Sequence, residues 1–296
     1  MKRWLGIDIG GTAIKAGIVD EGGSLLRHAS QPTPAALGRQ AILDAALALA
    51  RELLAAEPLV AGVGIGSAGR IDSINGTVRY ATENLPGWTG VKLAGAFEEA
   101  LQLPVCADND VNAAAVGEGW VGAAADIPSF ALLALGTGVG GALVHNHQIL
   151  GGASGGAAEF GHMILHPGGR PCNCGRQGCL EQYVSGTALT RSARAVTPEW
   201  DSRLLMNAHA ARDKRAAPVI TQFANDLATA IINVVQMFDP EAVLIGGGLA
   251  DSRGQWWEEM LNFLSQAMPA SPPLLPAALG NNAGVTGAAR MAMLRS

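Results

Sequence analysis

Residues 4–26 read WLGIDIGGTAIKAGIVDEGGSLL, and this stretch decides the fold because the chain uses its pattern twice. The apolar run 4–9 ends in the turn Gly10-Gly11-Thr12, and two further strands, 16–19 and 24–26, then flank a diglycine hairpin signal. A strand ending in aspartate and a diglycine turn can offer backbone N–H groups to phosphates, with the carboxylate reaching Mg²⁺ or its waters. Alone this signal is weak, because a Gly-Gly turn in an ordinary hairpin is the commoner explanation.

The second copy of the pattern lies at residues 130–150, FALLALGTGVGGALVHNHQIL. It repeats the order of strand, glycine–threonine turn, strand, tight turn and strand, with Gly136-Thr137-Gly138 as its first turn. A third glycine turn, 246–248, follows the buried strand 242–245, and an adenine or ribose can rest on such a turn. Two duplicated halves, each presenting a phosphate-type turn, predict a nucleotide bound between two domains.

Length and composition narrow the class of protein. The 296 residues suggest about two domains. Hydrophobic residues make up 49% of the chain, enough for a sizeable core, and 39 glycines indicate many tight turns. A net charge of −5 disfavours nucleic acids and anionic membranes as partners, and no apolar run approaches the length of a membrane span. Asp8 interrupts the only N-terminal apolar run, so we expect no signal peptide and a cytoplasmic protein.

Hydrophobic spacing predicts an alternation of strands and helices along the rest of the chain. The expected helices are 37–54, 91–101, 111–120, 187–195, 204–212, 218–238, 256–268 and 285–294. The further expected strands are 60–65, 77–80, 104–107, 130–135, 142–144, 148–150 and 242–245.

A cysteine-rich segment, residues 159–181, reads EFGHMILHPGGRPCNCGRQGCLE. Cys172, Cys174 and Cys179 fall within eight residues, and His162 lies ten residues upstream. Structural zinc sites use four such ligands in a tetrahedron, and Gly175 and Gly178 let the backbone curl back to one ion. A disulfide is the alternative, but it would leave one clustered thiol unpaired. His166 is a rival fourth ligand.

Carboxylates stand at both ends of that segment and at the end of an earlier strand. A closed metal site between Glu159 and Glu181 would fix two acids suited to gripping a polyhydroxylated ligand, although both can equally be solvated surface charges. Asp108-Asn109-Asp110 follows the strand 104–107 and precedes a helix. Asp108 or Asp110 can therefore be a simple helix cap.

Taken together and in this order, the Asp8–Thr12 turn, Asp108-Asn109-Asp110, the Gly136–Gly138 turn and the cysteine-rich segment resemble the ROK family of bacterial sugar kinases and sugar-responsive repressors. The resemblance covers nearly the whole chain. The pattern E-x-G-H followed by C-x-C-G-x-x-G-C-x-E is matched at every fixed position. It implies an α/β fold of two ribonuclease-H-like (actin-like ATPase) domains, 1–120 and 121–296, with an interdomain cleft. The closing helix, 285–295, is expected to pack back on the N-terminal domain.

The resemblance also implies roles for individual residues. Asp110 is the expected catalytic base. The expected sugar ligands are Ser67, Asn84, Asn109, Asp110, Glu159, His162 and Glu181. The expected zinc ligands are His162, Cys172, Cys174 and Cys179, which favours His162 over His166. The residues expected to bind nucleotide are Asp8, Gly10, Gly11, Thr12, Lys15, Thr137, Gly138, Gly247 and Gly248.

Two positions depart from the family pattern. Many relatives have Pro-Gly-Pro where this chain has Ser67-Ala68-Gly69, and glutamate is usual at Asp108. Because of the first departure, the resemblance does not predict which substituents the sugar substrate carries.

The function that the resemblance implies is an ATP-dependent kinase for the 6-hydroxyl of a hexose or N-acetylhexosamine. Glucose and N-acetylmannosamine fit best, and N-acetylglucosamine also fits. Mg-ATP is the expected co-substrate, zinc is structural, and a homodimer is the family's habit. A sugar-responsive sensor without catalysis is the alternative. A repressor is disfavoured, because family repressors carry a helix-turn-helix domain before the first glycine-rich strand, whereas Asp8 comes almost at once.

Overall fold

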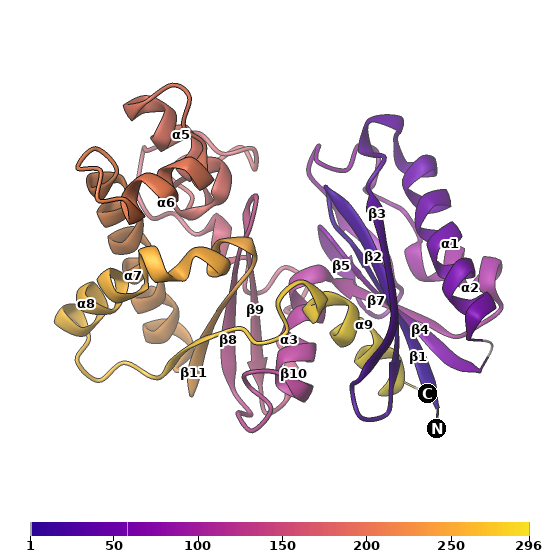
Figure 1. Ribbon diagram of the computed structural model, residues 1–296. Coiled ribbons are helices and arrows are strands. Elements are labelled where there is room, and N and C mark those ends of the chain that lie inside the picture. The colour runs from indigo at the N-terminus through magenta and orange to yellow at the C-terminus, as the bar shows by residue number, and fades with distance from the viewer. Residues whose placement is uncertain (1, 58, 296) are drawn as a thin grey trace. The chain divides into compact units, whose positions relative to one another are not determined.

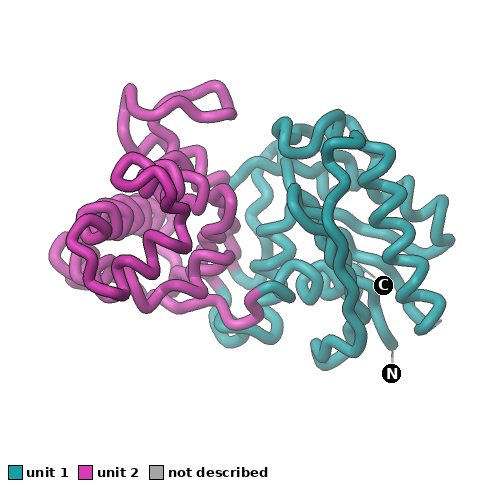
Figure 2. The backbone as a smooth tube through the Cα atoms, turned by 45° about the horizontal axis from the view of Figure 1, so that its top comes forward, with its two compact units in different colours: residues 1–128, 146–158, 281–296 teal, residues 129–145, 159–280 magenta. Residues whose placement is uncertain are grey.

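A computed structural model describes residues 2–57 and 59–295, and the chain divides into two compact units. Unit 1 comprises residues 1–128, 146–158 and 281–296, and unit 2 comprises 129–145 and 159–280 (Figure 2). Two segments from the later part of the chain, 146–158 and 281–296, therefore belong to the same unit as the N-terminal strands.

Unit 1 is built on a five-stranded sheet with the order β3-β2-β1-β4-β7 (Figure 1). The first three strands form an antiparallel meander, and β4 and β7 add to it in parallel with β1. Ile9 pairs with Ile14, so the Gly10-Gly11-Thr12 turn closes a tight hairpin. The strands are β1 (Arg3–Ile9), β2 (Ala13–Asp20), β3 (Leu25–Pro32), β4 (Val60–Ser67) and β7 (Val105–Asn109).

Helices cover both faces of this sheet. On one face, α1 (Arg39–Ala56) buries Ile42, Ala46, Leu49 and Leu53, which recur at helical spacing and join the strands in the main core of the unit. On the other face lies α9 (Ala283–Met293), whose Ala289 and Ala292 pack with Trp4, Val19 and Cys106. The sheet is thereby sandwiched between the first and last long helices of the chain.

Glycines let α9 approach the sheet at backbone distance. A Cβ atom on Gly6 of β1 would collide with the backbone oxygen of Val285, and one on Gly64 of β4 with that of Ala288. Gly287 plays the same part in the crossing of α9 with α3 (Asp110–Val121). The chain therefore needs glycine at these positions for close packing rather than for unusual backbone angles.

Unit 2 repeats the sheet of unit 1. Its strands run in the order β9-β8-β11-β12, with β8 and β9 antiparallel and β11 and β12 added in parallel, as β2-β1-β4-β7 do in unit 1. The duplication predicted from the two glycine–threonine turns is thus confirmed at the level of topology, and the fold is α/β. The strands are β8 (Phe130–Leu135), β9 (Val139–His145), β11 (Ala242–Gly246) and β12 (Leu274–Pro276). The two-residue strand β10 (Gln148–Ile149) falls in the range 146–158, which belongs to unit 1.

The remaining helices agree with the sequence expectations to within a few residues, because their apolar spacing is regular. They are α2 (Leu93–Leu101), α5 (Gly186–Val196), α6 (Ser202–Ala210), α7 (Ala217–Phe238) and α8 (Trp257–Ala267). The sequence reading missed β5 (Arg70–Asp72), which pairs with β6 (Thr77–Tyr80), the four-residue helix α4 (Glu181–Val184), and β12. Within the described residues, no helix is long and apolar enough to cross a membrane.

Candidate functional site

The four predicted metal ligands lie together in unit 2. The ligand atoms of His162, Cys172, Cys174 and Cys179 all lie within 4.8 Å of one another. His162 Nδ1 is 3.7 Å from Cys172 Sγ, and Cys174 Sγ is 3.6 Å from Cys179 Sγ. Four ligands at zinc bond lengths in a tetrahedron stand about 3.5–3.8 Å apart. This donor set therefore fits a closed, structural zinc site.

The backbone of the segment explains why three cysteines converge. Gly175 and Gly178 both adopt positive φ, at 87° and 81°, a region that glycine enters without strain. Short bridges pair Pro171 with Gln177 and Ile164 with Cys179, so the chain folds back on itself around the thiols. All four cysteines of the chain lie among the described residues and are free, so the disulfide alternative finds no support.

His166, the rival ligand, is committed elsewhere. Its Nε2 lies 2.9 Å from Asp226 Oδ1 on α7, and its ring meets the Tyr183 ring edge-on at 4.4 Å. His166 therefore fixes the cysteine-rich segment to the helices behind it, while His162 joins the thiols.

The two carboxylates that flank the metal cluster are positioned by short elements. Glu159 precedes the single helical turn 160–162 that carries His162, and Glu181 is the first residue of α4. Glu181 Oε2 accepts a hydrogen bond of 3.1 Å from the backbone N–H of Val139. A side chain at Gly138 would collide with that same carboxylate oxygen. The end of the cysteine-rich segment and the Gly136–Gly138 turn are therefore in direct contact.

In unit 1, the site residues gather where three parallel strands end. Asp8 of β1 is in register with Gly66 of β4, and Gly66 with Asp108 of β7. Ligands of open α/β sheets bind at this carboxyl edge. A Cβ on Gly66 would stand 3.3 Å from the Cα of Asp110, so glycine lets the start of α3 come close to the sheet.

Asn109, rather than either aspartate, caps α3. Its Oδ1 accepts hydrogen bonds from the backbone N–H groups of Val111 (2.9 Å) and Asn112 (3.1 Å), the usual bonds of an N-cap. Its Nδ2 donates to the carbonyl of Gly69 at 2.9 Å, which ties the helix start to the turn after β4. Asp110 is the first residue of the helix, and its Oδ1 accepts from Val111 N at 3.0 Å. The interpretation of Asp108 or Asp110 as the N-cap is wrong.

Asp108 has a structural environment. Its Oδ1 accepts from Asn109 N at 2.6 Å and from the side-chain amide of Asn112 at 2.9 Å. Burial raises the pKa of the Asp108 carboxyl, and the hydrogen bonds from Asn112 and Asn109 oppose that rise. The Asp108 side chain therefore stabilises the start of α3 through hydrogen bonds within the protein.

The first glycine–threonine turn lies beside a carboxyl group with a strongly perturbed pKa. Burial raises the pKa of Asp8 from 3.8 to about 6, and the nearby charge of Lys15 opposes the shift. The Asp8 carboxylate touches the backbone of α9, where a side chain at Gly284 would come within 2.8 Å of it. Lys15 Nζ reaches the carbonyl oxygen of Asn281 at 3.3 Å. Gly11 and Thr12 are exposed, as a turn that receives a ligand must be.

The turns of unit 2 are placed similarly at strand ends. The Gly136–Gly138 turn closes with a hydrogen bond from Gly136 N to the Gly138 carbonyl at 2.9 Å, and Thr137 is exposed. Gly247 and Gly248 follow β11 directly and are both exposed. Gly247 adopts a φ of 81°, and a side chain there would collide with the backbone of Leu135.

Ser67, one of the expected sugar ligands, lies in a strand. It is the last residue of β4 and fully buried, and its Oγ accepts a hydrogen bond of 3.0 Å from the indole N–H of Trp88. Asn84 is exposed in the loop that Trp88 and Leu85 anchor in the core. Ser67 does not reach the surface, and it contacts this loop through its hydrogen bond with Trp88. In the sequence, Trp88 follows Pro86-Gly87, a pair typical of a turn, and only the structure shows that its ring is buried.

Comparison with known proteins agrees with this arrangement. The ROK family model matches residues 4–294. A glucokinase from Thermotoga maritima is 32% identical, covering 97% of this chain and 96% of its own length. An N-acetylmannosamine kinase from Shigella boydii is also 32% identical, covering 97% of each chain. The crystal structure of a ROK family glucokinase from Streptomyces griseus in complex with glucose and AMPPNP superposes with a TM-score of 0.88, at 32% identity and 99% coverage of both chains. The chain belongs to the ROK family.

Proposed function

We propose that this protein is an ATP-dependent sugar kinase that phosphorylates the 6-hydroxyl of a hexose or N-acetylhexosamine, with glucose and N-acetylmannosamine the best candidates. The observation that carries the proposal is that the three side chains of Asp108-Asn109-Asp110 have different hydrogen-bonding environments. Asn109 caps α3 and Asp108 bonds within the fold, while Asp110 begins the helix at the carboxyl edge of the sheet. The names of the relatives, glucokinase and N-acetylmannosamine kinase, support the substrate class.

In the proposed reaction, Asp110 accepts the proton of the sugar hydroxyl as that oxygen attacks the γ-phosphorus of ATP, and the bond from this phosphorus to the β–γ bridging oxygen breaks to release ADP. Phosphoryl transfer depends mainly on positioning and on stabilisation of the phosphoryl charge, so a single well-oriented base is sufficient. The hydrogen bond from Val111 N to Asp110 Oδ1 orients the carboxylate that is proposed to accept the proton.

The phosphates are assigned to the glycine turns. Mg-ATP supplies the transferred group, and the residues proposed to hold it are Asp8, Gly10, Gly11, Thr12, Lys15, Thr137, Gly138, Gly247 and Gly248. Backbone N–H groups in such turns form concavities that favour anions. Lys15 adds a positive charge, and the ionised Asp8 carboxylate is proposed to hold the magnesium ion or its waters.

The sugar's remaining hydroxyls are assigned to Asn84, Asn109, Glu159, His162 and Glu181. Asn109 already donates to Gly69 O, so one N–H of its amide is left for a ligand. Zinc at the cysteine cluster would do no Lewis-acid chemistry, because four protein ligands complete its shell. Its proposed part is to hold Glu159, His162 and Glu181 in place.

Purified protein should be tested with ATP and a panel of glucose, mannose, N-acetylglucosamine and N-acetylmannosamine, with product analysis for the phosphorylated position. We expect one of these sugars to be turned over with a kcat/KM at least tenfold above the others. A protein that binds a sugar in calorimetry yet consumes no ATP with any of them would instead be the sensor of the alternative reading.

Asp8 should destabilise the free protein at neutral pH. Its pKa of about 6 in the fold exceeds the ordinary 3.8, so the folded chain binds a proton more tightly than the unfolded chain between these values. Stability from this group is therefore present below pH 4 and lost as the pH rises to about 6. We expect Asp8→Asn to raise the free energy of unfolding at pH 7 by about 1–3 kcal/mol. Urea unfolding at several pH values measures the effect.

The control for this prediction is its pH dependence. Parent and Asp8→Asn should approach equal stability towards pH 4 and diverge above it, while the variant loses affinity for Mg-ATP. A variant less stable than the parent throughout this range would show that the Asp8 carboxylate holds the fold rather than a ligand.

A further inference from the structure

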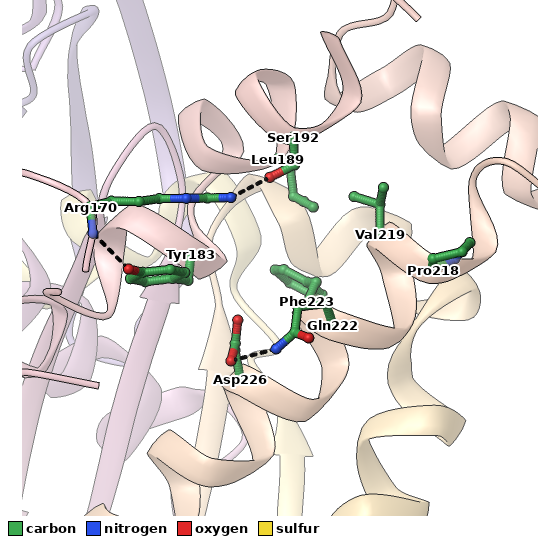
Figure 3. A pocket seen from close by; sticks show the side chains of 9 residues that line it. All are labelled: Arg170, Tyr183, Leu189, Ser192, Pro218, Val219, Gln222, Phe223 and Asp226. Carbon is green, nitrogen blue, oxygen red and sulfur yellow. Dashed lines mark hydrogen bonds between the residues drawn. The ribbon is translucent and has the colours of Figure 1, made fainter. Parts of the chain in front are cut away.

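A pocket in unit 2 is lined by none of the residues assigned to sugar, nucleotide or zinc. It has a volume of about 220 Å³ and opens between the cysteine-rich segment, α4, α5 and α7. Figure 3 shows Arg170 extended over the ring of Tyr183 towards Ser192, with Gln222 and Asp226 projecting from α7 on the opposite side. Its lining residues are Arg170, Tyr183, Leu189, Ser192, Pro218, Val219, Gln222, Phe223 and Asp226.

Arg170 is held in a fixed position at one end of this pocket. Its guanidinium carbon stands 4.8 Å from the centre of the Tyr183 ring, a cation–π contact. One terminal nitrogen donates to the carbonyl of Gln182 at 2.8 Å, and the other donates to Ser192 Oγ at 3.2 Å. These bonds leave three of its five N–H groups for a ligand.

A second guanidinium shares the same anchor. Arg191 on α5 also donates to the Gln182 carbonyl at 2.8 Å, so the two cationic groups lie within two hydrogen-bond lengths of each other. Burial, and then the charge of Arg170, lower the pKa of the Arg191 guanidinium. Among the residues that the structure describes, no carboxylate lies at ion-pair distance from either arginine. Two adjacent cations without an acid partner form a site that favours an anion.

The other end of the pocket is lined by polar side chains that favour hydroxyl groups over an anion. Asp226 is almost fully buried, and its Oδ1 accepts from His166 Nε2 at 2.9 Å and from Gln222 Nε2 at 3.0 Å. A carboxylate accepts further hydrogen bonds at its second oxygen, which suits the hydroxyl groups of a ligand and repels an anionic group. Between the two ends lie the apolar side chains of Leu189, Val219 and Phe223.

We propose that this pocket is a second small-molecule site, and that it binds a phosphate monoester of a short hydroxylated carbon chain. The phosphate would lie on Arg170 and Ser192, with the hydroxyls towards Asp226 and Gln222. Arg191 does not line the pocket and would contribute through its positive charge beside Arg170. A phosphate monoester carries nearly two negative charges at pH 7 and so matches two guanidiniums better than a carboxylate does. The volume is below the range of about 300–1,000 Å³ that drug-sized ligands occupy, which limits the ligand to a compact molecule.

A ligand in the pocket would contact α4, the helix that begins at Glu181. Arg170 and Arg191 hold the carbonyl of Gln182, and Tyr183 lines the pocket, so both residues after Glu181 are affected by a ligand. Given the proposed kinase function, a bound phosphate monoester should change the KM for sugar more than kcat. This consequence rests on the proposed function, whereas binding itself does not.

The test is calorimetric titration of the full chain with glycerol 3-phosphate, with glycerol and inorganic phosphate as partial ligands. We expect one site per chain, with glycerol 3-phosphate binding at least tenfold more tightly than inorganic phosphate. Arg170→Ala should weaken binding by about ten- to a hundredfold, since it removes hydrogen bonds to a charged group. Arg191→Ala should weaken it by a smaller factor, because it removes a neighbouring positive charge and one of the bonds that hold the Gln182 carbonyl. Arg194→Ala, an equal change of charge on the exposed side of α5, is the matched control and should leave the affinity within twofold.

Failure of this proposal is separate from failure of the kinase assignment, because the titration requires no turnover. Absence of binding, or binding that both arginine variants leave unchanged, would overturn the proposal. If Arg170→Ala does not fold by circular dichroism, the exposed Arg191 decides alone.

Discussion

Asp110→Asn should lower kcat with ATP and the preferred sugar by about a hundred- to ten-thousand-fold, the usual contribution of a general base. The amide keeps the size of the carboxylate and an oxygen that can accept from Val111 N. It cannot accept the proton of the attacking hydroxyl. Because Asn109 caps α3, the substitution leaves the helix start intact, and we expect an unchanged melting temperature and a sugar affinity near that of the parent. Steady-state kinetics and calorimetry measure the two effects separately.

Asp108→Asn is the matched control, two residues away in the same motif. The amide retains an oxygen for Asn109 N and Asn112 Nδ2, and burial already favours the neutral form of Asp108. We expect turnover within about tenfold of the parent, well short of a lost general base. If Asp108→Asn is the inactive variant, or Asp110→Asn keeps near-parent turnover, the base has been assigned to the wrong aspartate.

Cys179→Ser should remove the metal and, with it, sugar phosphorylation. Cys179 is fully buried, lies 3.6 Å from Cys174 Sγ, and stands two residues before Glu181. A serine hydroxyl is a poor zinc ligand, and structural zinc is bound with an apparent free energy of about 10–16 kcal/mol in small sites at pH 7, so its loss frees the whole segment. We expect one zinc per chain in the parent by elemental analysis, well under a tenth of that in the variant, and at least a hundredfold fall in kcat/KM.

Cys106→Ser is the control for that result. Cys106 is a buried thiol of unit 1 whose pKa burial raises to about 11, and it lies outside the metal cluster. This variant should keep its zinc and most of its activity. Parent protein without stoichiometric metal, or a Cys179→Ser enzyme of normal activity, would contradict the structural role of zinc.

Local spacing carried most of the fold prediction. Apolar residues at helical intervals placed α1 and α7 nearly residue for residue, and the repeated glycine–threonine turns predicted the repeated sheet. The cysteine spacing, with Gly175 and Gly178, predicted a cluster that the structure assembles. These features are readable because the interacting residues are near one another in the sequence.

The rest depends on contacts between distant residues. Nothing near Ser67 shows that Trp88 will cover it, or that Asn109 will bridge to Gly69 and take the cap from its neighbours. The bond of Glu181 to Val139 and that of His166 to Asp226 join positions 42 and 60 residues apart. Side chains of the same chemical type receive their roles from such contacts, which spacing does not encode.

The glycine contacts of α9 have a consequence for how the chain is made. Protein synthesis delivers β1 first and α9 last, yet Gly6 and Gly64 fit against the backbone of that final helix. One face of the first sheet therefore stays uncovered until α9 has been synthesised. Unit 2, which comprises residues 129–145 and 159–280, needs no residue of α9 and can close earlier. The N-terminal strands are thus the last to be sealed, and during translation they are the surface that a chaperone must shield.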